Sequence, residues 1–398
     1  MRMIPTPFST SSVSVVSNFT QTSGAINVGI VGAGQLARMM GECAHDAGVR
    51  VTVLALSPND AAVETCDEVV IGEPTDAHAL DQLAEAVDVV TFDHELVDLD
   101  QIEGLERRGV VVRPSAKALR YAVDKAHQRR ALSVAGLPVP RFIVVTSSAD
   151  HMLPAFLDEI GDDVVIKTAR GGYDGRGVWF STSRNETLAL IDQLPGEAVL
   201  EERVELLGEV AQLIVRAVDG SVMLYPLVTT VQSERMCAEV RFPAEASLET
   251  SRRAEELAEQ LASLIDVVGI LAIEFFMTPS GLVVNEVALR PHNSGHWTIE
   301  GTTNNQFANH LRAVSGQTLG VVRILHPCAV MVNVVGDDEP GSIEAAERVP
   351  GVHVHDYGKS WRPGRKLGHV TVVGDDAPSA HVQAWKGARA YGTRTRET

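Results

Sequence analysis

Cysteine and positive charge are both scarce in this sequence. The four cysteines (Cys43, Cys66, Cys237 and Cys328) lie far apart, with no CxxC pair and no histidine at zinc-ligand spacing. This spacing argues against a disulfide framework or a structural zinc site, and it favours a cytoplasmic location. Lys and Arg number 34 against 52 Asp and Glu, which gives a net charge of -18. Such an acidic surface disfavours a nucleic-acid partner.

Long hydrophobic runs are also absent. No apolar stretch approaches the ~20 residues that span a membrane, so we expect no membrane partner. The first residues are rich in Ser and Thr, and their apolar segment Val13–Val16 is too short for a secretory signal. We therefore expect residues 1–24 to be a disordered extension. The remaining chain of the 398 residues is long enough for two or three domains.

Residues 25–122 alternate β-branched runs with amphipathic stretches, which predicts a parallel sheet covered by helices. The expected strands are Ile26–Val31, Val49–Ala55, Glu68–Ile71, Val87–Thr91 and Val110–Val112, and the expected helices are Gln35–Ala47, Asp76–Ala86 and Asp98–Arg107.

Residues 123–320 show a different, α+β pattern. We expect helices at Asp124–Ala135 and Leu248–Asp266, strands at Val164–Lys167, Ala198–Glu201, Glu209–Arg216 and Val222–Tyr225, and a hairpin of Ile270–Met277 and Leu282–Val287. Residues 321–398 predict a small β-rich domain closed by a helix at Ala380–Tyr391.

A glycine motif, Gly32-Ala33-Gly34-Gln35-Leu36-Ala37, follows the first expected strand and begins a helix. It fits the GxGxxA pattern in which backbone amides at a helix N-terminus bind a dinucleotide phosphate. The second strand, however, ends without the acid that would bind a ribose hydroxyl, which disfavours a dinucleotide. A tight turn that requires glycine and a site for one mononucleotide phosphate remain, and we prefer the phosphate site.

A second glycine-rich stretch begins where Lys167 ends an apolar strand and runs to Val178. Its glycines let backbone amides approach phosphate oxygens, while Lys167 and Arg176 add positive charge. The stretch lacks GK[ST] and is therefore not a Walker A loop. A solvated hairpin loop is the alternative, and the lysine at the strand end favours a phosphate-binding loop that closes over its ligand.

Two acids, Glu274 and Glu286, each interrupt an apolar strand of the expected hairpin. Antiparallel pairing would bring the two carboxylates together, and they would repel unless a cation lay between them. Together with the oxygen of Asn285, they offer the ligands that Mg²⁺ prefers. Two acids on a solvent-facing strand side are the alternative interpretation.

The loop that follows the second acid carries Arg290, His292, Asn293 and His296. This combination makes a poor core and a good anion pocket, in which the arginine offers a planar fork to a carboxylate-like anion. His296 considered alone is more typical of a structural histidine.

Together these residues resemble the ATP-grasp superfamily and, within it, the N5-carboxyaminoimidazole ribonucleotide synthases. Four stretches carry the resemblance: Gly32–Met39 (GAGQLARM), Gly171–Gly177 (GGYDGRG), His292–Thr298 (HNSGHWT) and Arg362–His369 (RPGRKLGH). The combination of the second and third is specific, whereas the glycine turn alone is not. The resemblance implies an extension (1–24), an N-terminal α/β pre-ATP-grasp domain (25–122), an ATP-grasp domain of two subdomains (123–320) and a small β-rich C-terminal domain (321–398).

The resemblance also implies an activity. The chain would be an ATP-dependent carbon–nitrogen ligase of de novo purine biosynthesis, which carboxylates 5-aminoimidazole ribonucleotide with bicarbonate through carboxyphosphate. It would use ATP and Mg²⁺ and form a homodimer. The alternatives are a formate-dependent glycinamide ribonucleotide transformylase, a nucleotide-binding regulator without turnover and a dehydrogenase.

Site residues follow from the resemblance position by position. ATP would contact Lys125, Lys167, Gly172, Tyr173, Asp174, Gly175, Arg176, Gly177, Val178, Glu201, Glu202, Arg203, Val204, Glu209, Gln232, Asn285 and Glu286. Mg²⁺ would bind Glu274 and Glu286, while the catalytic set would be Arg290, His292, Asn293, Lys167 and Asp174. The ribonucleotide would contact Gly34, Gln35, Leu36, Glu95, Tyr173, Arg176, Lys359, Arg362, Arg365 and Lys366.

Three positions depart from the family pattern: Leu289 stands where proline is common, Pro291 where another residue is frequent, and Gln232 where a nucleotide-contacting histidine is frequent. The general base stays open between Asp174 and the departing phosphate.

Overall fold

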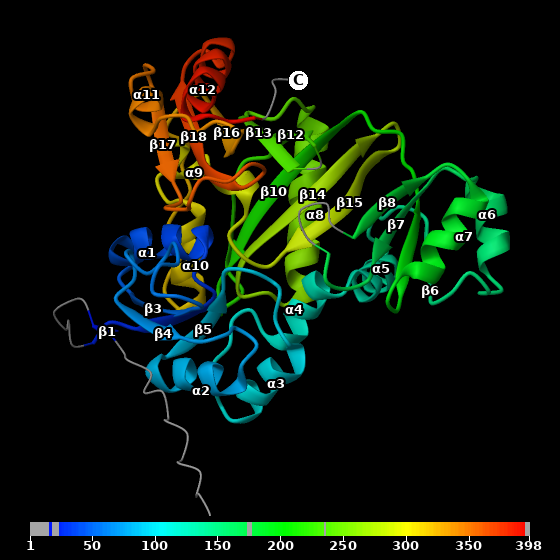
Figure 1. Ribbon diagram of the computed structural model, residues 1–398, viewed down its shortest axis with the longest axis horizontal. Helices are drawn as coiled ribbons and strands as arrows, with labels where there is room; N and C mark the ends of the chain where they lie inside the picture. Colours follow the sequence, from blue (N-terminus) through cyan, green and yellow to red (C-terminus); the bar gives the residue numbers. More distant parts are fainter. Residues whose placement is uncertain (1–15, 18–23, 173–176, 235, 395–398) are drawn as a thin grey trace, which may run out of the picture.

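The computed structural model describes residues 16–17, 24–172, 177–234 and 236–394, which form three β-sheets with helices packed around them (Figure 1). Most of the expected extension, and the loop residues Tyr173, Asp174, Gly175 and Arg176, lie outside this range. Within the expected extension, residues 16–17 form strand β1 (Val16–Ser17), which pairs with β4 (Glu68–Ile71). Among the described residues, no helix is both long and apolar enough to cross a membrane.

The N-terminal sheet confirms the expected parallel arrangement. Its order is β1-β4-β3-β2-β5, in which β4, β3 (Arg50–Ala55), β2 (Asn27–Val31) and β5 (Val89–Phe92) run parallel. The expected strand Val110–Val112 is wrong, because only Val112 forms an isolated bridge, to Val90. Pro114 follows two residues later and cannot donate to a strand ladder, so pairing stops there.

Five helices surround this sheet and lead out of it. They are α1 (Gln35–Ala47), α2 (Ala77–Ala86), α3 (Leu99–Arg107), α4 (Ala116–Val123) and α5 (Lys125–Val134). Asp76, Asp98, Ser115 and Asp124 cap α2 to α5 by accepting hydrogen bonds from backbone amides of the first turns, which explains where these helices begin.

A four-stranded antiparallel sheet forms the part of the molecule farthest from the N-terminal sheet (Figure 1). Its order is β6-β9-β7-β8, and its elements are β6 (Phe142–Val145), α6 (Leu153–Ile160), β7 (Val164–Thr168), β8 (Val178–Ser181), α7 (Arg184–Gln193) and β9 (Ala198–Glu202). The glycine-rich stretch joins β7 to β8, so its two ends are fixed by neighbouring strands.

A nine-stranded antiparallel sheet occupies the centre. Its main path is β15-β14-β10-β12-β13-β16-β18-β17, and β11 pairs with β10. The strands are β10 (Gly208–Arg216), β11 (Val222–Leu224), β12 (Val228–Ser233), β13 (Met236–Phe242), β14 (Gly269–Thr278), β15 (Gly281–Ala288), β16 (Cys328–Val335), β17 (Val352–Asp356) and β18 (Lys366–Gly374).

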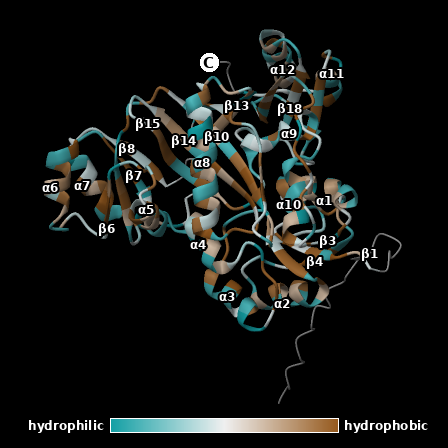
Figure 2. Ribbon diagram, turned by 180° about the vertical axis from the view of Figure 1, so that it is seen from behind, coloured by the Kyte–Doolittle hydropathy of each residue, from teal (hydrophilic) through white to brown (hydrophobic). Residues whose placement is uncertain are grey.

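Hydrophobic residues concentrate along the strands of this sheet, whereas the helices carry both hydrophobic and hydrophilic faces (Figure 2). Helix α8 (Leu248–Ile265) covers the sheet with a buried stripe that includes Leu257, Leu261 and Ile265. The remaining elements are the 3₁₀ turn Asn293–Gly295, α9 (Thr298–Gly301), α10 (Gln306–Val314), α11 (Ile343–Glu347) and α12 (Ala377–Tyr391).

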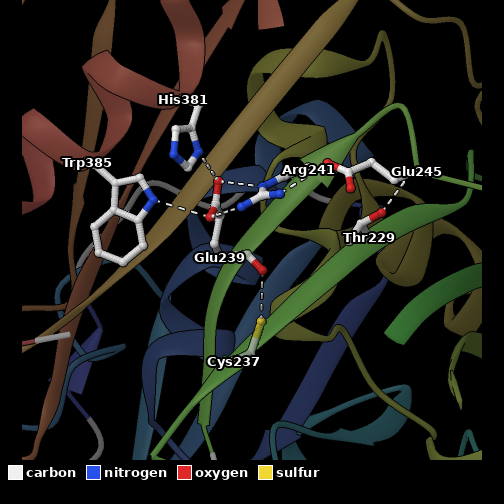
Figure 3. Close-up of polar contacts among 7 residues, drawn as sticks. All are labelled: Thr229, Cys237, Glu239, Arg241, Glu245, His381 and Trp385. Atoms are coloured by element: carbon white, nitrogen blue, oxygen red, sulfur yellow. Dashed lines mark hydrogen bonds and ion pairs between the residues drawn. The ribbon is translucent and has the colours of Figure 1, made fainter. Parts of the chain in front are cut away.

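The C-terminal strands do not form a sheet of their own. Strand β16 pairs with β13, so β16 to β18 extend the central sheet. At this junction the buried carboxylate of Glu239 accepts two hydrogen bonds from Arg241, and its two oxygens lie 2.6 Å from His381 Nδ1 and 3.2 Å from Trp385 Nε1 (Figure 3). This network ties α12 to the central sheet.

Candidate functional site

The expected pair of acids is brought together by the β14–β15 hairpin. Glu274 and Glu286 are direct partners in the antiparallel register, next to a β-bulge that follows Glu274. The pKa of Glu274 rises to about 8, first because of burial and then because of repulsion by Glu286 and Glu209. No group of three or more His, Cys, Asp or Glu ligands occurs among the described residues. The pair is therefore an anionic position that a cation with further ligands from a phosphate would neutralise.

Lys167 lies at the end of β7 in a buried ionic cluster. Its Nζ is 2.8 Å from Glu201 Oε2 and donates to Asn285 Oδ1 at 3.4 Å. Arg129 completes the cluster by donating to Glu201 Oε1 and to the carbonyl of Asn285. Burial lowers the pKa of Lys167, whereas Arg129 and Lys167 lower the pKa of Glu201 to about 2 against the opposing effect of its burial. The cluster places a buried ammonium group beside the strand that carries Glu286.

The ends of the glycine-rich stretch are well positioned around this lysine. Val178 is the strand partner of Lys167, and the carbonyl of Gly177 accepts a hydrogen bond from Thr168. The backbone of Lys125, at the start of α5, donates to the carbonyl of Ala169. Gly172 precedes the four expected loop residues that lie outside the described part of the chain. The start of α5 and the base of the loop thus form one wall.

The end of β9 and the segment after it, expected to contact ATP, use their side chains in other contacts. Glu202 accepts hydrogen bonds from the backbone and side chain of Arg141, and Arg203 pairs with Asp163. Val204 is half-buried at the start of the connection to β10. Nearby, burial raises the pKa of Glu209, while a hydrogen bond with Gln232 opposes that rise.

The anion loop, which we define as residues 290–296, lies between the paired acids and the N-terminal sheet. Arg290 donates to Glu95 Oε2 at 2.6 Å, and His292 Nε2 lies 3.8 Å from Glu274 Oε1. Burial, together with Arg290 and Lys366, lowers the pKa of His292 to about 3, so the ring is neutral at neutral pH. Asn293 lies beside the thiol of Cys237. The loop offers a guanidinium and a neutral imidazole to an anion.

A cavity of about 600 Å³ lies between the glycine motif and the segment that joins β17 to β18. Its lining includes His94, the neighbour of the Glu95 that Arg290 binds. It is lined by Gly34, Gln35 and Leu36 on one side and by Lys359 and Arg365 on the other. Lys359 Nζ donates to Gln35 Oε1 at 2.6 Å, which connects the two sides.

The four cations expected to contact the ribonucleotide, Lys359, Arg362, Arg365 and Lys366, do not lie together. Lys359 and Arg365 line the cavity, whereas Arg362 is exposed and is not part of its lining. Lys366 instead lies close enough to Glu274 and His292 to lower the pKa of each.

One residue in this cavity was missed by sequence reasoning. Asp93 is buried directly after β5, where its Oδ2 accepts a 2.6 Å hydrogen bond from the backbone of Gly34. Its Oδ1 has no hydrogen-bond partner. A Cβ on Gly32 would lie 2.0 Å from Oδ1, so the glycine motif makes room for a carboxylate. The sequence pattern could have identified Asp93, because it is an acid at the carboxyl end of an expected parallel strand, where α/β folds bind ligands.

Comparison with known proteins covers all three regions of the chain. Family models match at residues 25–123 (ribonucleotide synthetase preATP-grasp domain), 130–307 (ATP-grasp domain) and 329–383 (phosphoribosylaminoimidazole carboxylase C-terminal domain). The N5-carboxyaminoimidazole ribonucleotide synthase of Mycobacterium tuberculosis is 42% identical over 361 residues, which is 88% of this chain and 84% of that protein. The corresponding protein of Corynebacterium ammoniagenes is 38% identical and covers 90% of each chain.

Solved structures give the same picture. The N5-carboxyaminoimidazole ribonucleotide synthetase of Thermus thermophilus superposes with a TM-score of 0.84 at 35% identity, over 93% of this chain and 100% of that chain. The Aspergillus clavatus N5-carboxyaminoimidazole synthase in complex with ADP and 5-aminoimidazole ribonucleotide superposes with a TM-score of 0.83 at 29% identity, over 92% and 98%.

Proposed function

The chain belongs to the N5-carboxyaminoimidazole ribonucleotide synthases, ATP-dependent carbon–nitrogen ligases of purine biosynthesis, and from this premise we propose how its residues carry out the reaction. The observation that carries the proposal is the position of the anion loop. His292 lies against Glu274 on one side, and Arg290 binds Glu95 of the N-terminal domain on the other. An anion held here lies between an ATP site and a ribonucleotide site.

ATP binds between the four-stranded sheet and the central sheet. Lys167 faces its phosphates, and Gly177 and Val178, at the end of the glycine-rich stretch, lie beside Lys167. Glu274 and Glu286 hold Mg²⁺, which when bound supplies positive charge to the transferring phosphoryl group. The raised pKa of Glu274 supports this assignment, because two carboxylates in register are both ionised only when a cation lies nearby.

Bicarbonate is oriented by Arg290, His292 and Asn293. One of its oxygens attacks the γ-phosphorus of ATP, a new O–P bond forms, and the bond to ADP breaks. The product, carboxyphosphate, hydrolyses readily, so the reaction requires a site that excludes water. The exocyclic amine then attacks the carboxyl carbon, phosphate leaves, and the amine proton passes to the departing phosphate or to Asp174, which lies outside the described residues.

The ribonucleotide occupies the cavity beside the glycine motif. Lys359 and Arg365 neutralise its phosphate, and Asp93 Oδ1, which accepts no hydrogen bond and lies 3.7 Å from His94 Nε2, accepts one from a ribose hydroxyl. The carboxylate of Asp93 already accepts the hydrogen bond of the Gly34 amide, so this amide is not available to the phosphate. The phosphate therefore lies toward Lys359 and Arg365. We further propose that the enzyme works as a cytoplasmic homodimer.

The test follows an oxygen atom. With ¹⁸O-labelled bicarbonate and 5-aminoimidazole ribonucleotide, the phosphate released from ATP should carry one label from bicarbonate. Glu286→Gln should lower ATP turnover by about 100-fold or more and leave the fold intact, because an electrostatic contact to the reacting phosphoryl group is lost. Glu256→Gln, in an exposed ion pair on α8, is the matched control. Unlabelled phosphate, or turnover with formate and glycinamide ribonucleotide instead, would refute the proposal.

A further inference from the structure

Two motif histidines without an assigned role, His296 and His369, are far apart in the sequence and in contact in the fold. Their ring centroids are 4.9 Å apart, and His355 stacks on the other side of His369 at 4.4 Å and 12°. We call these three rings the histidine stack. His296 and His369 are completely buried, and burial lowers the pKa of both, so the two rings pack without charge repulsion.

One end of the stack is attached to the anion loop. Gln306 on α10 donates to the carbonyl of His292 at 2.7 Å and accepts from its amide at 2.8 Å. The same side-chain amide lies 3.1 Å from His296 Nδ1. His296 therefore shares one positioning residue with the ring that faces Glu274.

The central ring, His369, is attached to residues 357–365, which we call the phosphate loop. Tyr357 OH lies 2.9 Å from His369 Nδ1, and Lys359 Nζ lies 5.6 Å from the centroid of the Tyr357 ring. His355 Nε2 lies 2.6 Å from Glu300 on α9, next to the anion loop. Helix α9 lies beside β18 in Figure 1, as these contacts require.

We propose that the histidine stack positions the anion loop and the phosphate loop relative to each other, so that carboxyphosphate formed on one is captured by the ribonucleotide held on the other. Each loop could bind its own ligand without the stack, but transfer requires both ligands in one geometry. Carboxyphosphate that is not captured takes up water and returns to bicarbonate and phosphate. ATP is then cleaved without carboxylated product.

The measured quantity is the amount of carboxylated product per ADP, because loss of folded enzyme lowers both equally and leaves this ratio unchanged. In wild type the ratio should be close to one. His369→Ala removes the central ring, and we expect the ratio to fall by about threefold or more while ADP release persists. The double variant Tyr357→Phe/His369→Phe keeps an aromatic ring at both positions. It also removes the Tyr357 hydroxyl, which would otherwise lose its partner His369, so it should restore the ratio.

The chain offers a matched control in His310, which is equally buried on α10 but bonds to Thr91 and the backbone of Ile270, outside the stack. His310→Ala should lower stability and leave the ratio near one. If His369→Ala does not fold, His355→Ala at the end of the stack, where the side chain is 21% exposed, gives the same test. A ratio that stays near one without the ring, or that falls equally in His310→Ala, would overturn the proposal.

This inference rests on the proposed function, and the KM of the enzyme for the ribonucleotide distinguishes an error in one from an error in the other. Lys359→Met should raise the KM for the ribonucleotide. If it does not, the assignment of the phosphate loop is wrong. If it does, and the ratio is insensitive to the stack, only the positioning role is wrong.

Discussion

Replacing Glu274 with Gln is expected to stabilise the unliganded protein while it abolishes ATP turnover. The pKa of Glu274 rises from its ordinary 4.5 to about 8, because burial and the neighbouring carboxylates of Glu286 and Glu209 disfavour the charged form. The folded protein therefore holds this proton more tightly than the unfolded chain does. Stability from this group is fully present below pH ~4.5 and is lost as the pH rises through ~8.

The size of this stability difference follows from the gap between the pKa of Glu274 in the unfolded chain and in the folded protein, because each unit of that gap is worth about 1.4 kcal/mol. The variant should exceed wild type in free energy of unfolding by about 1 kcal/mol at pH 5 and by about 5 kcal/mol at pH 9, because glutamine carries no charge. Urea denaturation at pH 5, 7 and 9 measures this difference. Glu256→Gln, on an exposed helix face, should show no such trend. A difference between Glu274→Gln and wild type that does not grow with pH would refute the reasoning.

Three further predictions concern the surrounding residues. Glu201→Gln leaves Arg129 and Lys167 buried without a counter-charge, and it should cost about 3–5 kcal/mol of stability, measured by urea denaturation. An unchanged midpoint would contradict the ionic cluster. Asp93→Asn keeps the shape of the side chain, and steady-state kinetics should show a KM for the ribonucleotide raised by about 10-fold with the KM for ATP unaffected; equal changes in both would argue against a ribose contact. Gly32 has a left-handed φ of +101°, and a Cβ at this position would lie 2.0 Å from Asp93 Oδ1. Gly32→Ala should therefore lower the melting temperature by several degrees, and an unchanged value would contradict the close approach.

The positions of individual helices and strands were largely predictable, because short-range sequence patterns determine them. The bounds of α1 (Gln35–Ala47) and β4 (Glu68–Ile71) agree with their expected ranges, and the expected hairpin brings Glu274 opposite Glu286. Apolar periodicity sets the extent of these elements, and a β-hairpin needs only its own turn.

Long-range pairing was not predictable in the same way. Nothing in the local pattern says that β16 joins β13, with Val332 opposite Glu239, because the two strands are about 90 residues apart in the chain. The expected β-rich C-terminal region and its closing helix are present, but its strands join the central sheet, which the sequence did not indicate.

The expected cations show why sequence proximity misleads where a strand begins. Arg365 and Lys366 are adjacent, but β18 begins at Lys366, so Arg365 belongs to the preceding loop and Lys366 to the central sheet. Arg365 therefore lines the ribonucleotide cavity, while Lys366 lies close to Glu274. Asp93 was missed because the glycine motif was interpreted for its backbone amides, whereas the structure shows a side chain between the glycines.

The most direct test of the proposed function is ADP release from ATP and bicarbonate, with and without 5-aminoimidazole ribonucleotide. We predict that the ribonucleotide strongly stimulates ADP release and that ¹³C from bicarbonate appears in the product as an N-carboxyl group. ADP release that is indifferent to the ribonucleotide, with no ¹³C in a product, would contradict the division of the site into an ATP end, an anion loop and a ribonucleotide cavity.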